Sequence, residues 1–128
     1  MAMITKKDLK LFLRQVNTIE EISEGSLYRE DWWDSTRNVR NRTLYNILKM
    51  AAARYDALVA ADNKASRELI EYLRQEGRIR KRITHELKQA PKGTDIIALA
   101  DGIETEERKG SQPIEESFRE FREQIKVI

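Results

Sequence analysis

Basic side chains are concentrated in two segments of this sequence, on either side of Asp62. If both segments are helices that double back at Asp62, residues at equal distances from the turn lie side by side, so that Arg42 comes level with Arg82. The two tryptophans, Trp32 and Trp33, precede the first segment. A basic end with aromatic side chains suits a phosphate backbone with stackable bases, and it also suits an acidic protein. The residues of this candidate binding site are Arg37, Arg40, Arg42, Arg80, Lys81, Arg82, His85 and Lys88.

The same cations have a simpler alternative explanation, a basic face that is solvated or paired within the protein. Residues 80–88 lie near the C-terminal end of their predicted helix, where the helix dipole favours positive charge. Arg37 and Arg40 instead fall in the opening turns of a helix, where positive charge is disfavoured. Pairing with Asp31, Asp34 or the acidic C-terminal part of the chain would compensate for this.

Acidic residues form two short groups near the first tryptophan. Their spacing is similar to the paired acidic clusters with which all-α nucleoside-triphosphate pyrophosphohydrolases hold Mg²⁺, because a hard cation needs several converging carboxylates. The second group follows the first too closely for both to face each other across a helix hairpin. The alternative is a solvated acidic face plus a helix cap. The residues concerned are Glu20, Glu21, Glu24, Asp31 and Asp34.

Other catalytic or cofactor motifs do not emerge from the sequence. There is no cysteine, which excludes disulfides, thiolate metal sites and cysteine nucleophiles, and there is no glycine-rich phosphate loop. His85 is the sole histidine, and its neighbour Glu86 points elsewhere on a helix, so the two do not make a dyad. We therefore predict no catalytic residue, no metal and no cofactor.

A helix-turn-helix is a further candidate, because Leu73, Gly77 and Ile83 have its spacing. Leu73 is large where that motif has a small residue, and charged residues flank Gly77 where it has apolar ones. A continuous or kinked helix is the alternative interpretation.

Two further features favour a protein partner. Trp32 and Trp33 either cover the open end of the bundle or anchor an interface, where tryptophan is enriched. The end of the chain predicts a helix over 113–128 with a narrow apolar seam, which either completes the bundle or docks on a second copy of the chain as a homodimer. The seam residues assigned to this interface are Ile114, Phe118, Phe121 and Ile125.

Composition places the chain in the all-α class. Of its 128 residues 40% are hydrophobic and 36% charged, with 5 glycines and 2 prolines, too few turn residues for a sandwich or barrel. The net charge of +2 is too small to indicate a partner by itself. No apolar run approaches the roughly 20 residues that a membrane-spanning helix needs, so we expect no membrane contact and a cytoplasmic location.

Apolar periodicity predicts one domain, a small helical bundle built on a long antiparallel hairpin over 35–89. A first helix is capped by Thr5 and ends at Gly25, and a polar connection leads to a cap at Asp34 or Ser35. The hairpin helices cover 35–61 and 65–89, with Gly77 as a weak point in the second. A short helix over 95–101 ends at Gly102, 94–112 forms a looser segment, and 113–128 forms the last helix.

Three functions remain open at this point. The first expectation is a non-enzymatic helical protein–protein interaction module, an adaptor or regulator that either acts alone or self-associates. The alternative is a nucleic-acid-binding protein that uses the basic end of the hairpin. The third is Mg²⁺-dependent nucleotide hydrolysis through the acidic groups.

Overall fold

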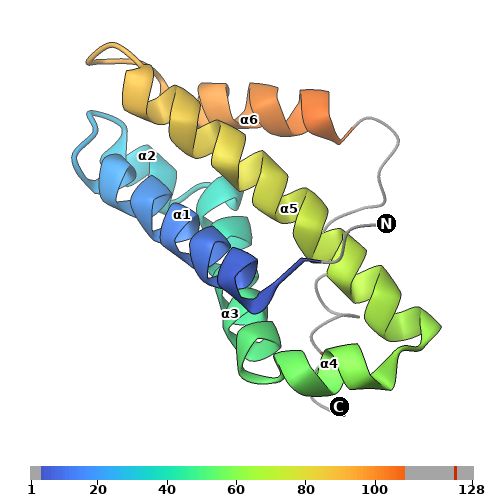
Figure 1. The fold of residues 1–128 in the computed structure, drawn as a ribbon. Helices are drawn as coiled ribbons and strands as arrows, with labels where there is room; N and C mark the ends of the chain where they lie inside the picture. Colours follow the sequence, from blue (N-terminus) through green and yellow to red (C-terminus); the bar gives the residue numbers. More distant parts are fainter. Residues whose placement is uncertain (1–3, 109–122, 124–128) are drawn as a thin grey trace.

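All regular secondary structure in the described part of the chain is helical, as predicted (Figure 1). The structure is a computed structural model that describes residues 4–108 and residue 123. The predicted helix over 113–128, with its apolar seam, lies outside the described residues. The helices are α1 (Lys6–Glu24), α2 (Arg29–Trp33), α3 (Thr36–Ala53), α4 (Tyr55–Ala61), α5 (Lys64–Gln89) and α6 (Ile96–Glu107).

Helix α1 begins and ends where the sequence indicates. The Asp8 amide donates to the Thr5 hydroxyl at 3.1 Å, and the Asp8 carboxylate accepts from the Thr5 amide at 2.8 Å, which completes the predicted capping box. At the other end, the Gly25 amide donates to the Glu21 carbonyl at 3.3 Å. Every third or fourth side chain between these limits is buried, so α1 presents one apolar stripe to the core.

The chain reverses at Asp62, as predicted, but α1 occupies much of the space between the two arms. Asp62 has a φ of 39°, the left-handed conformation that ends a helix and that aspartate tolerates. Helix α1 packs along both α3 and α5, and Figure 1 shows it running antiparallel to α3 and in the same direction as α5. The three apolar stripes therefore share one core, and a two-helix interface does not form.

The predicted helix over 35–61 is divided at Arg54, which separates α3 from α4. Its amide donates to the carbonyls of Met50 and Ala51 at 3.1 and 3.3 Å, and its φ of −115° leaves the helical range. After this break the Tyr55 hydroxyl reaches the Ile4 carbonyl at 2.8 Å. The apolar period continues across the break, so the sequence pattern did not reveal it.

Two other boundaries differ from the prediction. The connection expected before α3 contains the short helix α2, and the Trp32 side chain of this helix is buried in the core. The helix expected to stop at Gly102 continues to Glu107, because Glu104 is buried in ion pairs and keeps the backbone helical. The segment expected to be loose is thus ordered as far as Arg108.

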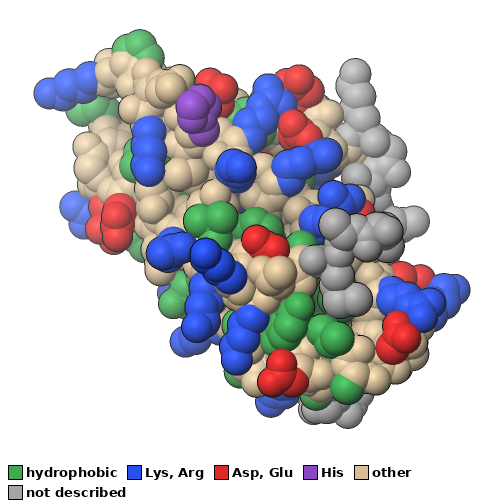
Figure 2. All heavy atoms as spheres, viewed as in Figure 1, with side chains coloured by type: hydrophobic (Ala, Val, Ile, Leu, Met, Phe, Trp, Pro, Cys, Tyr) green, Lys and Arg blue, Asp and Glu red, His purple; other side chains and the backbone are tan. Residues whose placement is uncertain are grey.

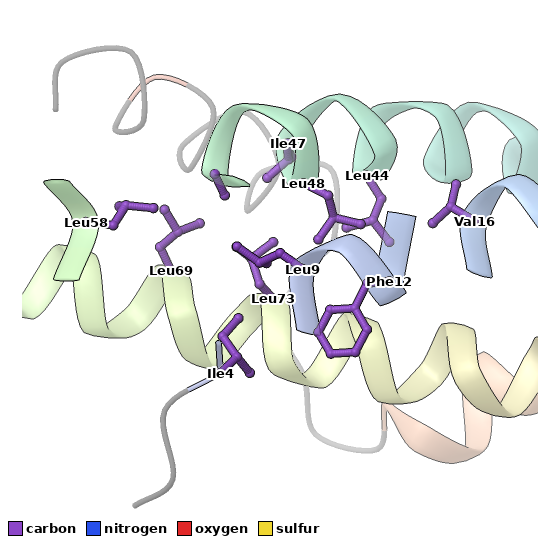
Figure 3. Close-up of a cluster of buried hydrophobic side chains, with 11 residues drawn as sticks. Ile4, Leu9, Phe12, Val16, Leu44, Ile47, Leu48, Leu58, Leu69 and Leu73 are labelled. Carbon is purple, nitrogen blue, oxygen red and sulfur yellow. The ribbon is translucent and has the colours of Figure 1, made fainter. Parts of the chain in front are cut away.

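Two apolar clusters make up the core. The first joins α1, α3, α4 and the first half of α5, and Figure 3 shows its side chains converging from these helices. The second lies at the other end, between the last turns of α1, α2, the second half of α5, and α6. Its buried members are Ile19, Trp32, Ile79, Ile83, Leu87, Ile96, Ala100 and Ile103.

Helix α5 runs unbroken through Gly77, so the helix-turn-helix interpretation is wrong. Gly77 is buried against the ring of Phe12, and a Cβ atom placed there would overlap three ring carbons. The glycine is therefore needed for the close approach of α1 to α5 and does not break the helix.

Replacing Gly77 tests this close approach. We expect Gly77→Ala to lower the free energy of unfolding by about 1–2 kcal/mol, because overpacking costs about 1–3 kcal/mol while alanine gains only about 1 kcal/mol over glycine in a helix. Gly102 is the matched control, since its Cβ would meet nothing within 4 Å. Gly102→Ala should therefore stabilise the protein in urea unfolding. Equal effects of the two substitutions would contradict the packing role of Gly77.

Candidate functional site

The structure divides the eight predicted basic residues among three environments. Arg37, Arg40 and Arg80 turn inward and form ion pairs with acids of α5 and α6. Arg42 lies over the Trp33 ring, 5.9 Å from its centroid, and Arg82 pairs with α6 at 2.9 Å. The remaining three, Lys81, His85 and Lys88, are exposed on α5. These residues therefore do not form one surface.

The inward-facing arginines belong to an ionic cluster that lies next to both apolar clusters. Arg80 is 2% exposed, and its Nη1 lies 3.0 Å from Glu104 Oε1 and 3.8 Å from Glu76 Oε2. Its Nε donates to Asn41 Oδ1 at 3.1 Å, which links α5 to α3. The members of the ionic cluster are Arg37, Arg40, Glu76, Arg80, Asp101, Glu104 and Arg108.

Glu104 is the central anion of the ionic cluster. It pairs with Arg37, its Oε2 lies 3.7 Å from Arg40 Nη1 and 3.5 Å from Arg108 Nε, and only 4% of its side chain is exposed. Arg108 also donates to Glu76 at 2.6 Å. For Arg37 and Arg40, the structure thus supports pairing with the acidic C-terminal part of the chain, one of the alternatives considered from the sequence.

Burial perturbs the titration of the groups in and beside the ionic cluster. Desolvation lowers the pKa of Arg80 to about 10, although the charge of Glu76 opposes this. Desolvation also lowers the pKa of Arg37, and the positive charge of Arg40 adds to the effect. For Tyr72, which lies beside the cluster, burial raises the pKa of the phenol well above its ordinary value, and Glu76 raises it further.

The ionic cluster leaves little room for a ligand. The cavity that it borders, between Trp32, Arg37, Arg80 and Glu104, has a volume of about 10 Å³, space for at most one water molecule. We therefore regard the cluster as structural, a set of paired charges that holds α3, α5 and α6 together.

The two tryptophans have different environments. Trp32 is 2% exposed and lies in the second apolar cluster, which agrees with the interpretation that it covers the core. Trp33 is half-buried beneath Arg42. The other predicted interface residues, those at 114–125, lie outside the described residues.

The acidic groups near α2 do not converge. Within residues 4–108 and residue 123, no group of three or more His, Asp or Glu side chains is placed to hold a metal ion. The magnesium hypothesis for Glu20, Glu21, Glu24, Asp31 and Asp34 therefore receives no geometric support.

The exposed cations of α5 join a row of cations on α1 that the sequence reasoning did not select. Phe12 meets Gly77, and the Thr84 hydroxyl donates to the Gln15 carbonyl at 3.4 Å, so Arg14 lies at about the level of Lys81. Figure 2 shows lysine and arginine side chains gathered over α1 and α5 on the viewed side. We name the exposed residues Lys7, Lys10, Arg14, Lys81, His85 and Lys88 the cationic face.

The cationic face has no ion pair within the described part of the chain. The neighbouring arginines of α5 do pair: Arg74 with Glu71 at 2.6 Å, and Arg78 with Glu107 at 3.2 Å. Two acids of α1 border the face. Asp8, near one end, is engaged in the α1 cap, and Glu21, near the other end, is exposed. Positive charge thus remains free along both helices.

An open pocket of about 230 Å³ lies at one end of the bundle, between the loops that follow α1 and α5. Its lining includes Ile22, Leu87 and Ile96, and Leu27 at its edge is 79% exposed. No histidine, aspartate or glutamate lines it. The pocket therefore offers mainly apolar contact, and Lys92 is the one charged residue of its lining.

Comparisons of the chain with models of protein families, with curated proteins and with solved structures find no match. No helix among residues 4–108 combines the length and the apolar character needed to cross a membrane. The geometry described above is therefore the basis for a functional argument.

The sequence contained a signal for the ionic cluster. On α5 the buried positions recur as Leu69, Leu73, Glu76, Arg80 and Ile83, so two charges occupy places on the core-facing stripe. Such a pair, four residues apart within an apolar stripe, indicates buried partners elsewhere in the chain.

Removing the central anion should destabilise the protein strongly. We expect Glu104→Gln to lower the free energy of unfolding by about 3–5 kcal/mol, because it leaves buried arginines without their counter-charge. Glu106→Gln is the control, since Glu106 pairs with Arg82 at 2.9 Å but is 64% exposed, and its loss should cost at most about 1 kcal/mol. Similar costs in urea unfolding would show that the cluster contributes no more than a surface pair.

Tyr72 should give stability a pH dependence in alkaline solution. The folded state holds the phenol proton more tightly than the unfolded state, so this contribution is complete below the unfolded pKa of 10.0 and is lost as pH rises above it. We expect Tyr72→Phe to lose less stability between pH 8 and pH 11 than the parent protein. A parallel loss of stability in the parent protein and in Tyr72→Phe would contradict the assignment.

Proposed function

We propose that the protein is a non-enzymatic helical interaction module that binds an anionic macromolecule through the cationic face. The observation that carries this proposal is the row of exposed cations on α1 and α5 that have no ion-pair partner among residues 4–108. Elsewhere on α5 the arginines are neutralised by acids of the same chain. Charge left free on two adjacent helices is typical of a surface that meets an external anion.

Helix electrostatics explains only part of the cationic face. Lys88 lies in the last turn of α5, where the dipole favours a cation. Lys7 lies in the first turn of α1, where the dipole disfavours one, and the acid of that turn, Asp8, is engaged in the cap. The α1 half of the face therefore lacks a local structural reason, which supports an external partner.

The chemistry of the face suits binding better than catalysis. Lysine and arginine side chains attract anions and donate hydrogen bonds. His85 has no carboxylate partner among the described residues that would make it part of a catalytic dyad. The proposal therefore assigns affinity, and no bond-making step, to this surface.

Charge reversal on the face tests the proposal. We expect the parent protein to bind heparin resin at low salt, and Lys10→Glu/Arg14→Glu/Lys81→Glu to lose most of this retention, because it places three anions in the centre of the face. The matched control Arg29→Glu/Lys49→Glu/Lys64→Glu reverses two lysines and one arginine that are exposed elsewhere. Each variant has a net charge of +2 − 6 = −4.

The control separates a local surface from overall charge. It should retain clearly more heparin binding than the face variant, with circular dichroism confirming that both are folded. Equal loss in the two variants, or failure of the parent protein to bind, would show that the cationic face is not the binding surface.

A further inference from the structure

We infer that the anionic partner is a nucleic acid, held by its phosphate backbone without sequence selection; this rests on the function proposed above. Surfaces that bind proteins differ from surfaces that bind nucleic acids in their composition and in the spacing of their charges. In both respects the cationic face favours a nucleic acid.

The face lacks the apolar centre that a protein partner needs. Protein interfaces have a core of apolar and aromatic side chains within a polar rim. Among the described residues, the exposed large apolar side chains are Leu27 at 79% and Val39 at 61%, and both lie elsewhere, in the loop after α1 and on α3. On α1, the residues that alternate with the cations include half-buried Leu11, exposed Asn17 and half-buried Thr18. Surfaces this polar and positive are typical of interfaces with nucleic acids.

The spacing of the cations suits a regular polyanion. On each helix they follow at three- or four-residue intervals, which places neighbours about 5–6 Å apart on one side. A step of seven residues along a helix rises by about 10 Å, and packed helices lie about 8–10 Å apart. Because Arg14, the last cation of the α1 row, lies about level with Lys81, the first of the α5 row, the two rows follow one another and cover a patch of roughly 20 Å by 10 Å. DNA presents one phosphate about every 1.7 Å along its axis, so flexible lysine and arginine side chains find several phosphates within such a patch.

The face contains few groups that distinguish bases. Base recognition uses stacking aromatic side chains or bidentate contacts to base edges. The face has no phenylalanine, tyrosine or tryptophan, its one aromatic ring is the imidazole of His85, and its one guanidinium is that of Arg14. Trp33 lies on α2 with Arg42 over its ring. Contacts to the backbone alone fix orientation and affinity but carry no sequence information.

Counter-ion release provides a quantitative expectation. Five members of the face carry a permanent charge at neutral pH: Lys7, Lys10, Arg14, Lys81 and Lys88. If each neutralises one phosphate of a DNA duplex, the logarithm of the binding constant falls with the logarithm of salt concentration with a slope of about −4.5. Removing one of these charges should reduce the slope by about 1, equally for all sequences.

Fluorescence anisotropy with labelled oligonucleotides tests the inference. The probes are two DNA duplexes of unrelated sequence, an RNA duplex and a single strand, with poly-glutamate as the protein-like polyanion. We expect both DNA duplexes to bind with equal affinity and with a slope near −4.5, and poly-glutamate to compete weakly. Lys81→Gln should lower affinity and slope for both duplexes, whereas the control Lys49→Gln, exposed on α3, should leave the slope unchanged.

The outcomes separate this inference from the proposed function. If heparin retention depends on the face but no oligonucleotide binds at low salt, the partner is another polyanion and the nucleic-acid inference is wrong while the proposed function stands. A preference of more than tenfold for one duplex would overturn binding through the backbone alone. If charge reversal on the face changes neither heparin nor oligonucleotide binding, both proposals fail.

Discussion

The contact between Arg80 and Glu104 is the interaction on which the arrangement of α3, α5 and α6 depends. Both side chains are almost completely buried, 3.0 Å apart, and each would be costly to bury alone. Asn41 on α3 and Glu76 on α5 complete the surroundings of Arg80. Because charge pairs tolerate little displacement in a low-dielectric interior, the ionic cluster restricts how these helices dock, whereas apolar contacts alone tolerate sliding.

The ionic cluster also determines which charges remain for an external partner. Arg37, Arg80 and Arg82 form ion pairs with acids of α6, so their charges are neutralised within the protein. Arg14 has the same side chain but no such pair among the described residues. Among the described residues, the exposed cations gathered on α1 and α5 keep their charge without an ion pair (Figure 2). The placement of α6 therefore helps to determine which cations are left for the proposed partner surface, even though α6 contributes no residue to it.

Helix α1 connects this surface to the core. Its inner side fills the space between α3 and α5, with Phe12 against Gly77, and its outer side carries half of the cationic face. Parallel packing on α5, fixed by the contacts of Phe12 with Gly77 and of Thr84 with Gln15, places the end of the α1 row beside the start of the α5 row. The proposed interaction surface is thus a consequence of core packing, because the position of α1 along α5 determines where the two rows meet.

The sequence by itself determined the helical class, the cap at Thr5, the reversal at Asp62 and most apolar stripes, since these depend on spacing and on contacts within a few residues. It did not determine the break at Arg54 or the extension of α6, where distant contacts override local preference. The candidate basic site was only partly predictable: the exposed lysines of α5 were selected, but Arg80 was assigned to the surface and the lysines of α1 were missed. Only the tertiary structure decided which cations are buried, because the pairing of an arginine depends on acids that are remote in sequence and become neighbours when α6 docks.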